Sequence, residues 1–236
     1  MSPALPLSTL QSFSSLGDFT GQGLACRRGE KLIFRGLDFT LPPGGALVLI
    51  GPNGSGKSSL LRLMAGLTPR EAGTLAWDGT DIREDPGAHR ARLHFIGHSD
   101  ALKPVLSAGE SLAFWAKMRG QVFGNIGAAI EPALAWFGLG NAVSLPCRYL
   151  SAGQRRRLAL ARLIAAPAEL WLLDEPLTSL DSDAAAQLLT VIAEHRAQGG
   201  RVALSTHAPI DLTDATRLSL ADFRPSPTES AAELLA

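Results

Sequence analysis

The 236-residue sequence is poor in cysteine and has no excess charge of either sign. Its two cysteines, Cys26 and Cys147, lie far apart and match no zinc spacing, so neither a disulfide framework nor a zinc site is expected. Buried or surface thiols in a reducing compartment are the default expectation. The 22 basic and 22 acidic residues balance, and no long run of like charge occurs. This balance argues against a nucleic-acid groove and against a polybasic membrane anchor.

The sequence also lacks a long uninterrupted apolar run. The most apolar region, 158–173, is broken by Arg162, Pro167 and Glu169, so no segment reaches the length of a bilayer-spanning helix. Residues 1–19 lack the basic start and the continuous apolar core of a signal peptide, which predicts that the chain is not secreted. A role at a membrane would therefore depend on docking to other chains.

The composition that is present suits a globular protein. Hydrophobic residues make up 46% of the chain and charged residues 19%, which is enough apolar material to bury a full core. The length predicts one domain, with room for an inserted subdomain.

The most informative stretch fits the phosphate-binding pattern G-x-x-x-x-G-K-[ST] at every constrained position. It consists of Gly51, Pro52, Asn53, Gly54, Ser55, Gly56, Lys57 and Ser58. The glycines permit positive φ angles, so that successive N–H groups can point at phosphates. Lys57 supplies a positive charge, the Ser58 hydroxyl is a candidate Mg²⁺ ligand, and the following helix directs its positive dipole end at the same place.

The surroundings of this loop decide between a nucleotide site and an ordinary turn. The run 46–50 is short and wholly apolar, as expected for a strand buried on both faces of a parallel sheet. After the loop, apolar residues repeat at helical spacing from Leu60 to Leu67, and Gly66 and Pro69 are stop signals. The order strand, glycine loop, helix favours the nucleotide site.

A second apolar run, 170–173, ends in Asp174 and Glu175. A carboxylate leaving a buried strand beside the phosphate loop can hold Mg²⁺ through water, and the next acid can orient the attacking water. Such acids are also common for structural reasons, but the upstream loop favours the functional interpretation. His207 follows the predicted strand 201–206, where it is either a capping residue or a sensor of the γ-phosphate.

The rest of the chain predicts an α/β protein with a helical insertion. Trp115, Trp136 and Phe137 are expected to fill a small helical core, with ligand stacking as the alternative. We expect two strands within 24–41, joined by a turn at 28–31, a hairpin at 73–79, and further strands at 93–97 and 218–223. We expect one helix to begin at a capping box at 107–110, and two others at 129–137 and 184–196.

The segment 150–162 reads Leu-Ser-Ala-Gly-Gln followed by a basic helix, and it resembles the signature sequence of ATP-binding cassette (ABC) ATPases. Ser151 and Gln154 can form a capping box, and a helix start with a neighbouring glycine offers several free N–H donors to an anion. A plain helix cap with a solvated basic face at 155–157 would also explain this segment in isolation. It does not explain the order of phosphate loop, helical insertion, signature, acidic strand and histidine.

The resemblance implies a P-loop NTPase fold of the α/β class, with a RecA-like core, an antiparallel β subdomain and an inserted helical subdomain. The ABC domain would span 20–223, the helical subdomain about 104–162, and 1–19 and 224–236 would be peripheral tails. ATP and Mg²⁺ are the implied cofactors, with Mg²⁺ on Ser58 and Asp174. The implied catalytic residues are Glu175, His207 and Lys57.

The nucleotide contacts implied by the resemblance come from two chains. Walker A covers Gly51 to Ser59, and Asp181 closes the D-loop. Family members act as head-to-tail dimers, so Ser151, Gly153 and Gln154 would cap the ATP of a second subunit. Because each motif occurs once, the resemblance implies a homodimer.

Three positions depart from the family pattern. The aromatic residue that often stacks on adenine is missing, and Arg28 or Phe34 is its candidate replacement. The Q-loop glutamine is also missing, and His98 or Ser99 stands there. Ala152 replaces the first glycine of the signature, a small change for a helix cap.

Within the family, the segments 96–103 and 172–181 and the signature are similar to the haem-exporter ATPases of cytochrome c biogenesis. This similarity implies an ATPase docked on integral membrane subunits at the cytoplasmic face of the inner membrane. The sequence has no C-x-x-C-H motif, and its histidines predict no direct haem site. The alternatives are an ABC ATPase with another cargo and a soluble ABC protein of DNA repair or the ribosome.

Overall fold

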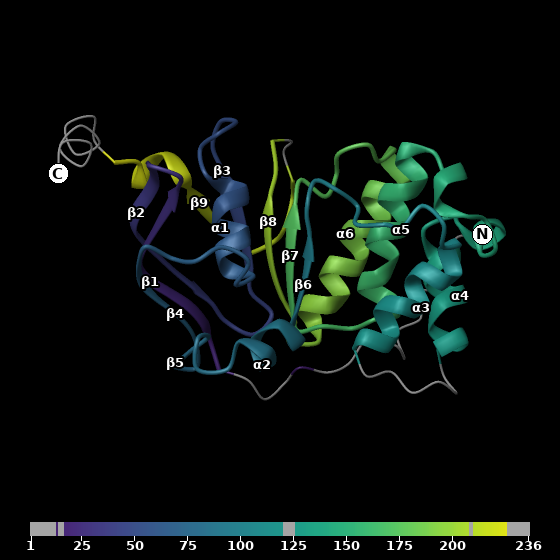
Figure 1. Cartoon of the computed structure of the whole chain (residues 1–236), viewed down its shortest axis with the longest axis horizontal. Helices are drawn as coiled ribbons and strands as arrows, with labels where there is room; N and C mark the ends of the chain where they lie inside the picture. The colour runs from purple at the N-terminus through teal and green to yellow at the C-terminus, as the bar shows by residue number, and fades with distance from the viewer. Residues whose placement is uncertain (1–12, 14–16, 120–125, 208–209, 226–236) are drawn as a thin grey trace.

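The computed structural model describes residues 13, 17–119, 126–207 and 210–225. A five-stranded parallel sheet in the order β6-β7-β8-β3-β9 forms its centre (Figure 1). These strands are β6 (Leu93–Ile96), β7 (Leu170–Asp174), β8 (Arg201–Ser205), β3 (Ala46–Ile50) and β9 (Thr216–Ser219). The predicted strands at 46–50, 93–97 and 170–173 are confirmed, each within one residue.

The parallel sheet is covered on both faces, which explains its continuous apolar runs. Trp171 and Leu173 of β7 pack into the core beneath α5 (Ala152–Ala165) and α6 (Ser182–Ala197). Leu170 and Leu172 pack into the opposite core, where they meet α1 (Lys57–Met64). Because successive side chains of a strand alternate in direction, one short strand serves both cores.

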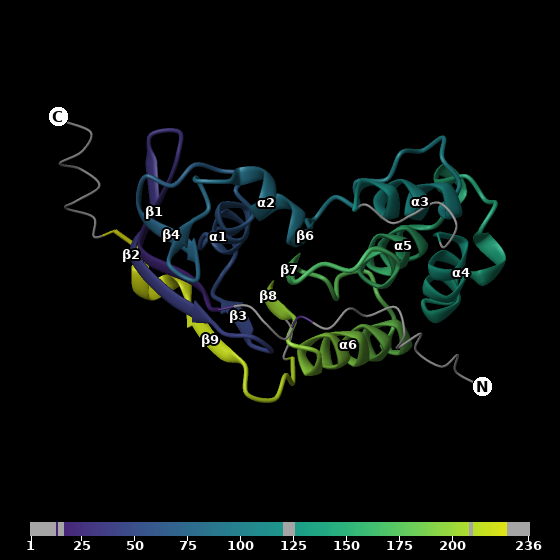
Figure 2. The same ribbon diagram turned by 90° about the horizontal axis from the view of Figure 1, so that it is seen from below.

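A four-stranded antiparallel sheet lies beyond α1, in the order β2-β1-β4-β5 (Figure 2). Its strands are β1 (Phe19–Arg28), β2 (Lys31–Leu41), β4 (Ala72–Trp77) and β5 (Thr80–Asp81), and the short helix α2 (Pro86–Ala91) follows. The two predicted strands around the turn and the predicted hairpin are confirmed. The first strand starts earlier than expected, at Phe19, because this ring is fully buried against Trp77 at 4.5 Å between ring centroids.

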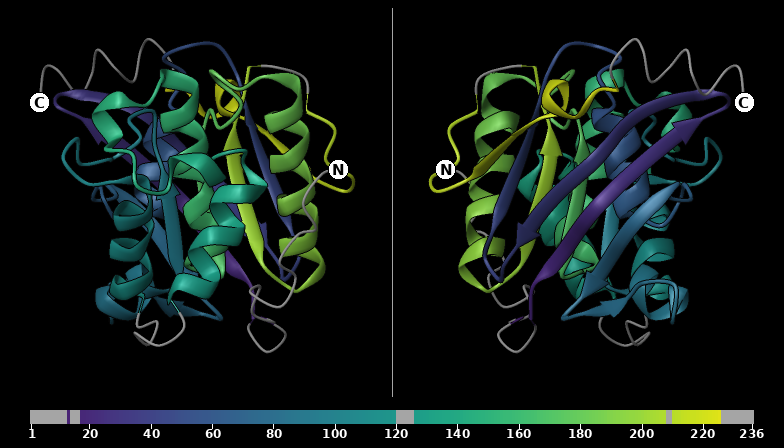
Figure 3. Two further views of the ribbon diagram at one scale, coloured as in Figure 1. Left: turned by 90° about the vertical axis from the view of Figure 1, so that its right-hand side faces the viewer. Right: turned by 90° about the vertical axis from the view of Figure 1, so that its left-hand side faces the viewer.

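Helices α3 (Ala108–Met118) and α4 (Ile126–Trp136) pack with α5 at the end of the molecule opposite the antiparallel sheet, and Figure 3 shows these two ends in turn. The capping box of α3 is confirmed. The core prediction is confirmed for Trp136 and Phe137, which are buried. It is wrong for Trp115, which is half-buried and lies outside the core cluster, with its ring against the Arg162 guanidinium at 4.6 Å.

Short 3-10 helices complete the described chain: η3 (Gly140–Ala142), η4 (Cys147–Tyr149) and η5 (Leu220–Phe223). The strand predicted over 218–223 is wrong beyond Ser219, because the chain turns into η5 there. Leu220 is buried in the core between the parallel sheet and α1, which we call the α1-side core. Cys26 and Cys147 are buried free thiols. The two proposed tails lie largely outside the described residues, and the domain boundaries stay predictions.

Across the described ranges, no helix is long and apolar enough to cross a bilayer.

A buried histidine links α6 to the central sheet. The His195 ring stacks on Trp171, with ring centroids 3.7 Å apart and planes 6° apart. Burial lowers the pKa of His195 from 6.5 to about 3. The native state therefore keeps this ring neutral, while an unfolded chain takes up a proton near pH 6.5. Below that pH the unfolded state binds more protons, so stability falls as the pH decreases.

We predict that His195→Gln flattens this pH dependence. Between pH 6.5 and 5 the natural chain should lose about 2 kcal/mol more unfolding free energy than the variant, from this histidine alone. Urea unfolding at the two pH values measures the difference. His98→Gln, which removes an exposed ring, is the matched control and should keep the natural slope. Equal slopes for His195→Gln and the natural chain would contradict the prediction.

Candidate functional site

The glycine loop 51–56 joins β3 to α1 and has the backbone conformation that the sequence motif requires. Its φ angles are 137° at Gly51, 76° at Gly54 and 108° at Gly56. Only glycine adopts such angles readily. A Cβ on Gly56 would lie 2.7 Å from Ile33 Cγ2, so side chains are excluded there by contact as well. The loop therefore turns sharply and presents backbone at the start of α1.

The first turn of α1 is suited to an anion. Gly56 is its N-cap and provides no side-chain hydrogen bond to the first N–H groups of the helix. Such N–H groups attract phosphate oxygens, as does the positive end of the helix dipole. Ser55 adds a second observation, because its buried Oγ has no hydrogen-bond partner within the described structure.

Lys57 lies at the base of this loop. Its Nζ donates to the carbonyl oxygens of Gly51 (2.8 Å) and Pro52 (3.1 Å), and it lies 3.4 Å from His207 Nε2. Burial lowers the pKa of Lys57, while the negative charges of Glu175 and Asp174 act in the opposite direction. Lys57 therefore places a cation between the phosphate loop and the carboxylates that end β7.

Asp174 joins α1 to the two central strands. Its Oδ1 accepts hydrogen bonds from Ser58 Oγ at 3.0 Å and from Ser205 Oγ at 2.7 Å. The register places Asp174 beside Ser205 on neighbouring strands β7 and β8. Ser205 is a site residue that the sequence reasoning missed. Its signal is a polar residue at the end of an apolar strand, two positions before His207.

Glu175 is held in an unusual backbone conformation directly after β7. Its φ is 50°, in the left-handed region that residues with side chains seldom adopt. The Glu175 N–H donates to Ser205 Oγ at 3.0 Å, and its Oε1 lies 2.8 Å from His207 Nε2. Thr178 Oγ1 donates to the other carboxylate oxygen at 3.5 Å. The structure thus brings Lys57, Glu175 and His207 together, as expected for one reacting centre.

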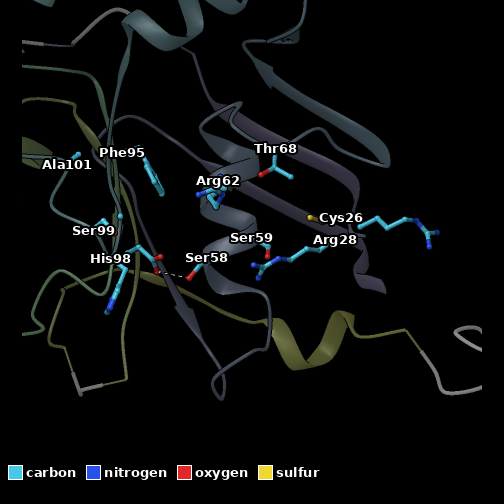
Figure 4. Close-up of a pocket in the computed structure, with 13 residues that line it drawn as sticks. Cys26, Arg28, Ser58, Ser59, Arg62, Thr68, Phe95, His98, Ser99 and Ala101 are labelled. Atoms are coloured by element: carbon cyan, nitrogen blue, oxygen red, sulfur yellow. Dashed lines mark hydrogen bonds between the residues drawn. The ribbon is translucent and has the colours of Figure 1, made fainter. Parts of the chain in front are cut away.

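A cavity of about 600 Å³ opens beside Ser58 and Asp174 (Figure 4). Arg28 and Ser59 line it from β1 and α1, and His98 and Ser99 line it from the loop after β6. The alternative adenine contact, Phe34, is wrong because this side chain is completely buried in the α1-side core. The remaining lining residues are Cys26, Arg27, Arg62, Thr68, Phe95, Gly97 and Ala101.

The signature residues lie outside the described lining of this cavity. Ser151 is the N-cap of α5 and forms the predicted capping box with Gln154. Gly153 packs closely, because a Cβ there would lie 3.2 Å from Ser179 O. Asp181 is the N-cap of α6, accepting from the Ala184 N–H at 2.8 Å. The structure therefore does not bring the signature to its own chain's phosphate loop.

The basic residues after the signature do not form one solvated face. That alternative is wrong for Arg156, which is only 4% exposed. Its guanidinium donates to carbonyl oxygens at the end of β7 and in the loop after β6. Sequence reasoning missed this residue because three consecutive arginines at the start of a helix do not show which one turns inward.

The residues present fit a magnesium ion bound together with phosphates. Mg²⁺ prefers hard oxygen ligands, and Ser58 and Asp174 offer a hydroxyl and a carboxylate at one edge of the cavity. Among the described residues, no group of three or more His, Cys, Asp or Glu side chains could hold a metal ion.

Together, the parallel sheet, the phosphate loop and the acidic end of β7 define a P-loop nucleotide-binding domain. The family model for the ABC transporter matches residues 34–178, and this chain belongs to that family. It is an ABC-type ATPase.

Curated relatives match over most of their length. The cytochrome c biogenesis ATP-binding export protein CcmA of Paramagnetospirillum magneticum is 54% identical to this chain. The match covers 87% of this chain and 94% of the relative. The protein of that name in Rhodospirillum rubrum is also 54% identical, over 90% of both chains.

Solved structures share the fold. An ATP-binding subunit of an ABC transporter has a TM-score of 0.74 at 25% identity, covering 80% of this chain and 79% of that chain. An ABC transporter ATP-binding protein from Pyrococcus furiosus has a TM-score of 0.76 at 22% identity, covering 89% of this chain and 100% of that chain. These likenesses confirm the α/β ABC nucleotide-binding fold predicted from the sequence.

Proposed function

We propose that this chain is the ATP-hydrolysing subunit of an export complex in cytochrome c biogenesis. The observation that carries this proposal is the 54% identity to a relative of that name over 94% of the relative's length. The cargo implied by the sequence resemblance is haem, and this chain supplies the energy of ATP hydrolysis without binding haem itself.

The phosphate loop from Gly51 to Ser59 binds the triphosphate through backbone N–H groups, and Lys57 adds a charge-assisted contact. Arg28, exposed at the rim of the cavity, is the proposed adenine contact. Ser58 and Asp174 are the proposed Mg²⁺ ligands. When bound, this ion neutralises charge on the phosphate oxygens.

The proposed base for hydrolysis is Glu175. It orients the attacking water and accepts its proton, while the carboxylate stays within hydrogen-bond reach of His207. His207 in turn contacts the γ-phosphate. Because Ser205 binds both Asp174 Oδ1 and the Glu175 N–H, one hydroxyl sets the spacing between the ion ligand and the base.

The site is completed by a second copy of the chain. Ser151, Gly153 and Gln154 are the proposed contacts to ATP held by the partner subunit, together with Asp181. Ser151, the N-cap of α5, is exposed, as a contact with a partner subunit requires. We propose a homodimer in which closure on two ATP molecules moves integral membrane subunits at the cytoplasmic face of the inner membrane.

We predict that Glu175→Gln removes most turnover and leaves ATP binding nearly intact. The amide cannot accept the proton, so kcat should fall by about 100-fold or more, while the Kd for ATP stays within about threefold. Phosphate release and binding of a fluorescent ATP analogue measure the two quantities. Glu131→Gln, on the exposed surface of α4, is the matched control. Undiminished hydrolysis by Glu175→Gln would remove the proposed role.

Co-purification tests the place of this ATPase in an export complex. A tagged chain expressed in its source cells should retain integral membrane proteins after extraction in mild detergent, and mass spectrometry should identify cytochrome c biogenesis proteins among them. Recovery of membrane subunits of another transporter would identify a different cargo. Recovery of RNA or DNA without membrane subunits would favour the soluble alternative.

A further inference from the structure

Arg156 is a buried arginine whose hydrogen-bonding capacity is fully used. A guanidinium carries five N–H donors. Nε donates to Pro176 O at 3.4 Å, and Nη2 donates to Asp174 O at 3.0 Å and Glu175 O at 2.8 Å. Nη1 donates to Gly97 O at 2.9 Å and to Asp100 Oδ1 at 3.4 Å.

These contacts fix the backbone of the proposed base. Three successive carbonyl groups, from Asp174 to Pro176, converge on one guanidinium. The Glu175 N–H is held by Ser205 on β8, so both polar backbone groups of Glu175 are bound by side chains. A left-handed conformation persists at a residue with a side chain only when its surroundings determine it. Arg156 and Ser205 hold this conformation, together with the turn hydrogen bond from the Thr178 N–H to Glu175 O at 3.2 Å.

The same guanidinium also holds the loop after β6. Its contacts to Gly97 and Asp100 bracket His98 and Ser99, which line the cavity across from Ser58 (Figure 4). This is the loop in which the family's glutamine is missing. A change in the position of this loop would therefore act directly on the guanidinium that holds the Glu175 carbonyl.

We propose that Arg156 is a positioning residue for hydrolysis, which couples the loop 97–100 to the orientation of Glu175. The inference rests on the proposed role of Glu175 as base. Arg156 does not itself line the cavity, but its guanidinium holds the carbonyl oxygens of Gly97 and Asp174, which do line it, as well as that of Glu175. It therefore acts on hydrolysis through the groups that it holds, Glu175 first among them. Lysine cannot replace it fully, because a single ammonium cannot reach acceptors on two separate segments in the planar geometry of a guanidinium.

The test is steady-state hydrolysis by Arg156→Gln and Arg156→Lys, with kcat expressed per mole of ATP bound. Because displacement of a reacting group by about 1 Å can cost about 100-fold, we expect a loss near that size for Arg156→Gln with KM within about threefold. Arg156→Lys keeps the charge and should recover part of the loss. Arg90→Gln, which removes the same charge from exposed α2, is the matched control and should keep the natural rate.

Normalising to bound ATP separates positioning from loss of folded protein. If Arg156→Gln does not fold, Arg156→Lys carries the same test, with reduced kcat at full ATP stoichiometry. A natural kcat in the folded variant would overturn the inference.

A double variant shows whether Arg156 acts through the base. In single-turnover hydrolysis of labelled ATP, adding Arg156→Gln to Glu175→Gln should cause no further loss, because the positioned group is already absent. A further loss near 100-fold would overturn the inference. Full activity of Glu175→Gln alone would instead contradict the proposed function, so the two failures are distinguishable.

Discussion

The hydrogen bonds accepted by Asp174 are the constraint on which the site depends. This carboxylate ends a strand that is buried on both faces, and it meets the α1 hydroxyl of Ser58 and the β8 hydroxyl of Ser205 at the same oxygen. One oxygen atom, Asp174 Oδ1, therefore fixes the relative positions of the phosphate loop, the proposed Mg²⁺ ligands and the proposed base. Because β7 and β8 run parallel and in register, the carboxyl ends of both strands lie at one edge of the sheet, where ligands of α/β proteins bind.

The second constraint is the turn after β7, where Glu175 has a left-handed backbone. That conformation has a cost of order 1 kcal/mol or more, and it is offset by side chains from α5 and β8 that bind its carbonyl and its N–H. The signature helix α5 therefore contributes residues both to the surface and to the interior of the molecule. Its N-cap Ser151 is exposed, while the Arg156 side chain reaches inward and donates to the carbonyl oxygens of the turn that carries the proposed base.

Sequence reasoning identified the parts of the site that are contiguous. The loop 51–58 and the acids after β7 are recognisable because local backbone needs and burial on both faces leave direct marks on residue type. Ser205 and Arg156 were missed because their roles come from contacts with residues about 30, 20 and 60 positions away. Phe34 was a wrong alternative and Trp115 a wrong core residue for the same reason, since neither a neighbouring helix nor a covering arginine can be read from spacing alone.

If two chains build each ATP site, as we propose, the Glu175→Gln chain should form a dimer that depends on ATP, because it binds ATP without consuming it. Sedimentation of this variant with and without Mg²⁺ and ATP measures the dimer. Adding Ser151→Asp keeps a good helix cap but places a negative charge against the partner's phosphates, so ATP should still bind and the dimer should be lost. An ATP-dependent dimer that survives Ser151→Asp, or a chain that stays monomeric in ATP at every concentration, would show that the two chains do not share the ATP site in this way.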